Sequence, residues 1–251
     1  MNHRKQLTVL LILLIVYALS AFLSYTFFLD QLTAFAGVPI PETDIPPFLF
    51  GLANAGTVLV LYGLLGLIGY WFAFKLGMPG IFSEDGNWRR WFFIPLLIGI
   101  IGGVALIIGD GIFAQFNGFG KFPHPAFPAS FFASLSAGIG EEIIFRGFVF
   151  GLWAFILNWL LKRFNGRTAA LWIANVIAAL AFGAGHLGLV FLMTGASTIS
   201  EVNPVLLVEV FLLNGIVGIM AGERYMKDGL VAAVGVHFWT DIVFHVLYGL
   251  F

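Results

Sequence analysis

Two adjacent glutamates, Glu141 and Glu142, lie in the middle of a long apolar stretch, and Arg146 follows within the same stretch. A charge held in hydrocarbon costs about 2.5 to 3.5 kcal/mol even on a lenient scale, so these groups require partners. Residues four apart share one face of a helix, and Glu142 can therefore pair with Arg146. Glu141 is rotated by about 100° from its neighbour and lacks that partner. The spacing predicts one structural acid and one acid that is free for chemistry.

Imidazoles and a further acid occur in later apolar stretches. His186 follows two glycines, whose small size permits the close approach of another helix. His237, Asp241 and His245 are spaced four apart, so a carboxylate can orient an imidazole and fix its tautomer. A glutamate and two histidines from three helices form the ligand set of a water-activating zinc site. Without a metal, the same groups can act as a general base with imidazole partners, and the residues alone leave both mechanisms open.

The remaining ionisable groups in apolar stretches are weaker candidates. Asp110 and Glu209 are single acids, for which we expect structural hydrogen bonds; lining a hydrated cavity is the alternative. His245 is expected to be a histidine of the bundle interior or of the membrane interface. His124 falls in a loop and receives no role.

The composition predicts that these groups lie on membrane-spanning helices. The 251 residues are 60% hydrophobic and 10% charged, which is far outside the range of soluble domains. The mean hydropathy is +1.00. Several apolar runs exceed the length of about 18 residues that spans a bilayer. The chain is therefore predicted to be all-α, a polytopic transmembrane helix bundle. The absence of cysteine excludes disulfides, thiolate catalysis and cysteine-ligated metals.

Apolar runs and their polar breaks predict about seven spans in one membrane domain. The fourth, of 34 residues, would reach about 51 Å as a helix and is too long for one crossing. Its glycines favour a kink, or a first part that lies in the interface. The first run is too long for the core of a signal peptide, and we expect a retained helix. The predicted spans are 7–29, 48–74, 91–116, 128–161, 168–193, 204–222 and 229–251.

The basic residues predict the orientation of these spans. Ten of the 12 lysines and arginines fall at alternate ends of the spans, whereas only Lys121 lies in an opposite loop. Cytoplasmic loops carry an excess of lysine and arginine, so the N-terminus is predicted to be cytoplasmic and the C-terminus outside. The ten residues are Arg4, Lys5, Lys75, Arg89, Arg90, Lys162, Arg163, Arg167, Arg224 and Lys227.

Three ordered motifs on separate spans resemble the CPBP family of intramembrane proteases, which includes the CAAX prenyl endopeptidases and the bacteriocin-processing or immunity proteins also called Abi. The motifs are Glu-Glu-x-x-x-Arg from Glu141, Phe-x-x-x-His from Phe182 to His186, and His-x-x-x-Asp from His237 to Asp241. The resemblance covers residues 128–251, the expected catalytic core, and leaves 1–127 as accessory helices.

The resemblance implies proteolysis within or beside the bilayer, with roles for matching positions. Glu141 would activate water, and His186 would bind or polarise that water directly or through a divalent metal such as zinc. His237 and Asp241 would stabilise the oxyanion or complete a metal site formed with Glu141 and His186. Asp241 stands where the prenyl endopeptidases have asparagine; an ionised aspartate cannot donate to an oxyanion, so orienting His237 or supporting a metal is favoured. Glu142 and Arg146 would hold the helix in register.

These expectations lead to a hydrolase that cleaves a membrane-associated, possibly prenylated CAAX-type peptide by attack of activated water. In the prenyl endopeptidases the cavity opens to the cytosol, and the resemblance implies the same opening here. The alternatives are a non-enzymatic immunity or partner-binding protein on the same scaffold, and a transporter that uses the buried groups as a proton or ion relay. The predicted partners are the lipid bilayer and a peptide or lipidated protein, with no nucleic acid.

Overall fold

The computed structural model describes residues 2–37 and 44–251, and these residues form helices without strands. The α-helices are α1 (His3–Phe27), α2 (Leu29–Ala36), α3 (Pro47–Thr57), α4 (Gly63–Lys75), α5 (Ile94–Phe113), α6 (Ala129–Glu142), α7 (Gly151–Leu161), α8 (Arg167–Gly185), α9 (Leu187–Thr194), α10 (Pro204–Asp228) and α11 (Leu230–Asp241). The π-helical segments are η1 (Val58–Tyr62), η2 (Arg89–Phe93), η3 (Ile143–Phe150) and η6 (Ile242–Leu247). Short 3₁₀ turns are η4 (Lys162–Phe164), η5 (Ile199–Glu201) and η7 (Tyr248–Leu250).

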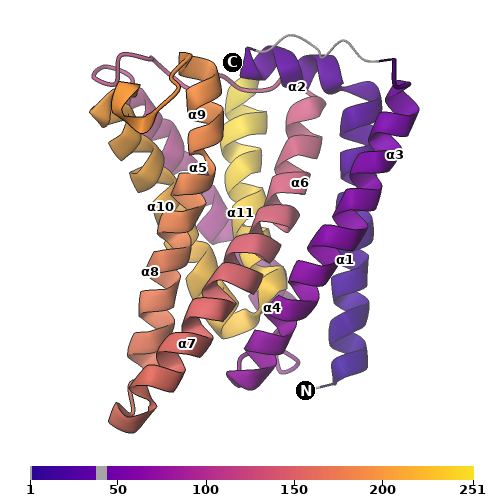
Figure 1. The fold of residues 1–251 in the computed structure, drawn as a ribbon, viewed down its shortest axis with the longest axis vertical. Helices are drawn as coiled ribbons and strands as arrows, with labels where there is room; N and C mark the ends of the chain where they lie inside the picture. The colour runs from indigo at the N-terminus through magenta and orange to yellow at the C-terminus, as the bar shows by residue number, and fades with distance from the viewer. Residues whose placement is uncertain (1, 38–43) are drawn as a thin grey trace.

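The described residues contain seven continuous helices that are long and apolar enough to cross a membrane, which confirms the predicted architecture. They stand side by side, and the N-terminus and C-terminus lie at opposite ends (Figure 1). The protein is therefore an integral membrane protein of the all-α class. The seven helices span Ala129–Phe164 and, on either side of it, His3–Phe27, Pro47–Lys75, Arg89–Phe113, Arg167–Thr194, Pro204–Asp228 and Leu230–Leu250.

The long fourth span is confirmed as one helical stretch of 36 residues, Ala129–Phe164. It runs diagonally through the bundle, from α6 to α7 (Figure 1). Between them η3 widens the helix directly after Glu142, and η6 widens the last helix directly after Asp241. π-helical turns are a recognised cause of kinks and are frequent at functional sites. Both distortions therefore occur where the sequence places its ionisable groups.

Different connecting segments lie at the two ends of the bundle. The N-terminus, residues 76–88 and residues 165–166 lie at one end, here called the basic end. At the other, the upper end of Figure 1, lie α2, α9, the C-terminus and residues 114–128. Side-chain contacts join the connections at each end. For example, the Arg90 guanidinium binds the main-chain oxygen of Lys227 at the basic end.

The segment of residues 76–83 closes the basic end. Its main chain is fixed by the buried Gln6 side chain, whose Oε1 accepts the N–H of Ile81 at 2.8 Å. The N–H of Leu230, the first residue of α11, donates to the carbonyl of Gly80 at 3.0 Å. These bonds satisfy backbone groups at both the loop and the helix N-terminus. The loop therefore forms a floor beneath the start of α11.

Small residues allow the second and fourth spans to pack with direct backbone contact. A Cβ added at Gly69 would lie 2.6 Å from the carbonyl carbon of Gly147 in η3. We expect Gly69→Ala to lower the free energy of unfolding by about 1 to 3 kcal/mol, because the two helices must separate. Denaturant unfolding of the purified protein measures this change. Gly56→Ala on the same span is the control, since no atom lies within 4 Å of its added Cβ; an equal loss for both variants would contradict the prediction.

Candidate active site

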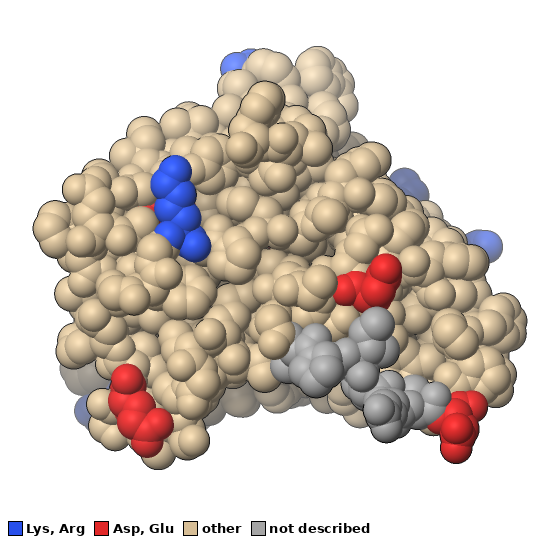
Figure 2. Space-filling model, turned by 90° about the horizontal axis from the view of Figure 1, so that it is seen from above, with Lys and Arg blue, Asp and Glu red and all other residues tan. Residues whose placement is uncertain are grey.

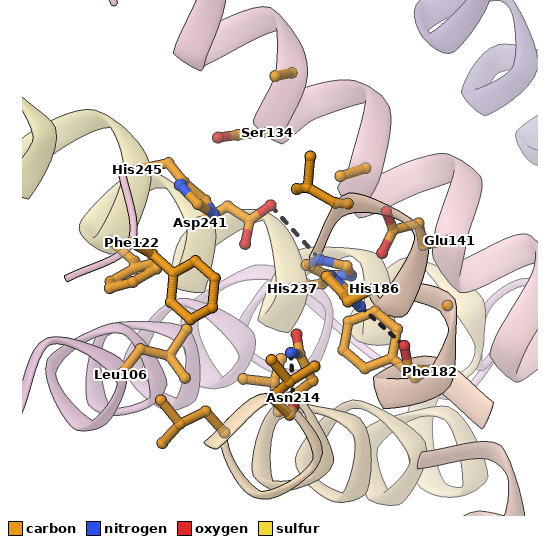
Figure 3. Close-up of a pocket in the computed structure, with 18 of the residues that line it drawn as sticks. Leu106, Phe122, Ser134, Glu141, Phe182, His186, Asn214, His237, Asp241 and His245 are labelled. Carbon is orange, nitrogen blue, oxygen red and sulfur yellow. Dashed lines mark hydrogen bonds and ion pairs between the residues drawn. The ribbon is translucent and has the colours of Figure 1, made fainter. Parts of the chain in front are cut away.

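A cavity of about 520 Å³ lies inside the upper half of the bundle and gathers the ionisable groups predicted from the sequence. Its wall includes Glu141, His186, His237, Asp241 and His245 among mostly apolar side chains. These labelled residues surround one hollow, and they lie on α6, α11, η6 and the junction of α8 and α9 (Figure 3). Groups separated by up to 104 positions along the chain are thus brought to one place.

The second acid of the pair, Glu142, is completely buried and has two partners. Its Oε1 lies 3.1 Å from Nη1 of Arg146, the i,i+4 ion pair that the spacing predicts. The same Oε1 lies 2.9 Å from Nδ1 of His237 on α11. An ionised carboxylate only accepts hydrogen bonds, so Nδ1 of His237 carries the proton and donates. Glu142 therefore orients an imidazole as well as pairing with an arginine, and this second contact was not predicted.

Arg146 is fully buried, and an aromatic ring supports its guanidinium. Its Cζ lies 4.6 Å from the ring centroid of Phe182, a distance that permits a cation–π interaction. Phe182 also meets the rings of His186 and His237 edge to face, at 4.9 and 5.3 Å. The ring thus separates the ion pair from the cavity and holds both imidazoles. Sequence reasoning gave Phe182 no role, although its fixed place four residues before His186 was the available signal.

Glu141 faces the cavity, and its carboxylate is not neutralised by a neighbour. Its Oε2 is buried and makes no hydrogen bond among the described residues. Tyr62 of η1 lines the same cavity, and the rings of Tyr62 and Tyr17 meet edge to face at 4.9 Å. A Cβ added at Gly140 would collide with the Tyr17 ring at 2.6 Å, so the glycine lets α1 approach next to Glu141. An unpartnered buried oxygen is costly and calls for an explanation, and Glu142, Asp110 and Glu209 each have one as well. Glu141 differs from these three acids because no ion pair or hydrogen bond to its side chain is found among the described residues, although it lies on the cavity wall.

His186 lies within the predicted span, at the single turn residue that separates α8 from α9. α8 ends at Gly185 and α9 begins at Leu187. Gly183 and Gly185, which favour the helix poorly, account for the break. Nδ1 of His186 lies 2.9 Å from the carbonyl oxygen of Phe182. A carbonyl only accepts, so Nδ1 carries a proton and Nε2 of the neutral ring can accept one.

His237 and Asp241 lie one turn apart on α11, as their spacing predicts. Nε2 of His237 is 3.5 Å from Oδ2 of Asp241, and both side chains are buried. His237 therefore lies between two acids, with Glu142 at Nδ1 and Asp241 near Nε2. In the protonated ring both nitrogens donate, and the Nε2 proton is then available to the cavity.

The donor groups do not fit a metal ion in this arrangement. Within residues 2–37 and 44–251, no three or more His, Asp or Glu side chains are placed so that they could share one.

At the upper end of the cavity, two histidines without a predicted role meet. Nδ1 of His124 lies 3.1 Å from Nδ1 of His245, so one ring donates an N–H to the other. Burial lowers the pKa of His124 below its ordinary value. Nearby, Nζ of Lys121 donates to the Tyr248 hydroxyl at 2.9 Å. These contacts attach the segment before α6 to the last helix.

Two further buried acids, Asp110 and Glu209, make the structural hydrogen bonds expected of them. Oδ1 of Asp110 accepts the N–H of Phe122 at 2.9 Å, and Oε2 of Glu209 accepts from the Asn117 side chain at 2.6 Å. Oδ1 of Asn117 in turn accepts two backbone N–H groups, those of Phe119 and Gly120, at 2.8 Å each. Glu209 also lines the cavity. Together these bonds fix residues 117–122 to α5 and α10.

Removing the Asn117 side chain should release this segment. We expect Asn117→Ala to lower the free energy of unfolding by about 1 to 3 kcal/mol, because Glu209 loses a buried donor and two amides lose their acceptor. Amide hydrogen exchange should show faster exchange confined to Phe119 and Gly120 and their neighbours. Gln115→Ala, an exposed change in the preceding turn, is the control. Unchanged exchange in Asn117→Ala would contradict the assignment.

Fold and cavity together define a polytopic membrane protein whose interior holds an acid and imidazoles suited to hydrolysis. Residues 123–243, slightly less than half of the chain, match the family model described as type II CAAX prenyl endopeptidase Rce1-like, and this segment contains Glu141, His186, His237 and Asp241. The match confirms the resemblance to the CPBP proteases and implies a protease. It overlaps the expected catalytic core, 128–251, although that division of the chain stays a prediction. No curated protein and no solved structure matches the chain.

Proposed function

We propose that this protein is an intramembrane endopeptidase in which Glu141 activates the attacking water. The observation that supports this proposal most directly is that the two adjacent glutamates have different surroundings. Glu142 is bound by Arg146 and His237 through Oε1 and is not part of the cavity wall, whereas Glu141 lines the cavity and has no ion pair among the described residues. A carboxylate in that position can accept a proton from water, as a general base must.

The neighbouring imidazoles supply the remaining groups. Water is held between Glu141 and Nε2 of His186 and attacks the carbonyl carbon of the scissile peptide bond. Glu141 takes the proton, and the tetrahedral oxyanion is stabilised by the Nε2 proton of His237. Glu141 then returns the proton to the leaving amine as the C–N bond breaks. Glu142 and Asp241 act on His237 as positioning residues, and no acyl-enzyme forms.

The substrate is proposed to be a peptide of a membrane-associated or lipidated protein. Most of the cavity wall is apolar, with Leu106, Phe122, Leu213 and Phe244 among its side chains. Its volume of about 520 Å³ lies within the range of binding cavities. A prenylated CAAX-type peptide is the first candidate, because the family description names that activity.

Purified protein in proteoliposomes should cleave at least one anchored peptide without an added cofactor. The test compares a prenylated CAAX peptide, its unprenylated form and a set of apolar membrane peptides, with mass spectrometry of the products. Parallel reactions with a chelator measure whether hydrolysis depends on a divalent metal. A correctly folded protein that cleaves none of these peptides would contradict the proposal and favour a partner-binding role.

A further inference from the structure

The cavity lies closer to the upper end of the bundle than to the basic end. Glu141 is 12 residues from the start of α6 at the upper end, and 23 residues from Phe164 at the basic end. At a rise of 1.5 Å per residue, these separations correspond to about 18 and 35 Å along the helix. Ser134 and Ala137 line the cavity on the turns above Glu141. The hollow therefore follows α6 from the catalytic acid toward the upper end.

Between the cavity and the basic end the interior is filled. A cluster of buried apolar side chains from α1, α4, η3, α10 and α11 occupies this level, and it includes Leu10, Ile143, Tyr225 and Leu230. The floor formed by residues 76–83 closes it from below through its bonds to Gln6 and α11. A peptide cannot pass from the basic end to Glu141 without unpacking this core.

At the upper end the boundary of the cavity is thinner. It consists of a segment that lacks helical hydrogen bonding, with Phe122, Pro123 and Pro125 on the wall, and of Phe35 from α2. α2 contributes no buried residue, in contrast to the spanning helices. The lining contains three acids, Glu141, Glu209 and Asp241, and neither lysine nor arginine. An uncharged, apolar peptide segment suits this passage, whereas an acidic one would be repelled.

The charges at the two ends of the bundle predict how the protein is oriented in the membrane. Ten lysines and arginines lie at or next to the basic end, and Lys121 is the one basic residue of the upper end among the described residues. Seen from above, the upper end is largely uncharged, with scattered acidic side chains and a basic side chain on its face (Figure 2). Because lysine and arginine accumulate on the cytoplasmic side, the basic end is the cytoplasmic one.

From this geometry we infer that the active site is reached from the outer face of the membrane, by an uncharged, apolar segment of a membrane-associated protein. The statement that the entering molecule is a substrate rests on the proposed function. The direction from which the cavity is reached does not depend on it. It differs from the cytosolic opening that the family resemblance implies. The consequence is that the scissile bond of any substrate, a prenylated CAAX-type peptide included, must be presented at the external surface, because the packed floor blocks entry from the cytoplasmic end.

The chain contains no cysteine, so single cysteines report access without interference. Ala137→Cys and Leu189→Cys place a thiol on two walls of the cavity. Ser197→Cys marks the upper end and Thr168→Cys the basic end, since both positions are exposed. A small, membrane-impermeant thiol reagent is applied to intact cells and to inside-out vesicles, and labelling of the full chain is measured by mass shift.

In intact cells, the cavity cysteines and Ser197→Cys should react at least tenfold faster than in inside-out vesicles, and Thr168→Cys should show the reverse. The inference is overturned if the cavity cysteines react with the side that labels Thr168→Cys, if neither reacts from either side, or if Ser197→Cys is labelled only in vesicles. Because labelling requires no hydrolysis, a protein that is labelled from outside but cleaves nothing contradicts the proposed function alone.

Discussion

Glu141→Gln is expected to lower the rate of peptide hydrolysis by about 100-fold to 10,000-fold, the usual contribution of a general base. The amide keeps the size of the side chain but cannot accept the proton of the attacking water. Since Glu141 forms no ion pair among the described residues, the variant should fold as the wild type does. Initial rates with a saturating anchored peptide, together with thermal unfolding of the same preparation, measure both quantities.

Glu209→Gln provides the matched control for this variant. Glu209 lines the same cavity, but it lies on α10 outside the three motifs and is bound by Asn117. Its amide replacement can still accept that hydrogen bond, so hydrolysis should change by less than about threefold. Equal losses in the two variants would show that negative charge in the cavity matters and the position of the base does not. Unchanged hydrolysis by Glu141→Gln would contradict the proposed role of Glu141 as the general base.

The second large effect concerns the buried ion pair. Arg146→Met is expected to lower the free energy of unfolding by about 3 to 5 kcal/mol, because Glu142 then remains buried without its cation. The double variant Glu142→Gln/Arg146→Met removes both charges and should recover most of that loss. In the double variant, the side-chain amide oxygen at position 142 can still accept the hydrogen bond from Nδ1 of His237. Denaturant unfolding of the two single variants and the double variant gives the coupling between the residues.

Arg163→Met serves as the surface control for this series. Arg163 is exposed at the end of the same span, so its replacement should change stability by no more than about 0.5 kcal/mol. Additive losses in the double variant would contradict a direct coupling of Glu142 and Arg146. A stable but inactive double variant would show in addition that the charge on Glu142 acts through His237.

The architecture could be predicted from the sequence because the bilayer imposes strong rules on a chain. Runs of apolar residues had to form helices, and their breaks fixed the seven spans to within a few residues except at the end of the sixth, which the structure extends from residue 222 to Asp228. The Glu142–Arg146 contact followed from helix periodicity, which operates within one element. The motifs also indicated which elements must meet.

Contacts between distant elements could not be obtained in the same way. Nothing in the order of residues states that Glu142 binds the Nδ1 side of His237, since that depends on how α6 and α11 cross. The span that contains His186 was predicted, but the one-residue turn at His186 was not, because the apolar pattern continues through the glycines before it and the leucine after it. The shape of the cavity depends on residues 117–125, whose packing is set by Asn117, Asp110 and Glu209 together.

The contact between Glu142 and His237 also restricts how the molecule can move. It ties α6 to α11 at the level of the cavity, so sliding or tilting one helix against the other would expose or separate buried charged groups. α2 has no buried residue, and α9 has only Val190. Under the proposed function, we expect α2 to move more easily than the helices that carry Glu141 and His237 when a peptide enters, because few buried contacts hold it.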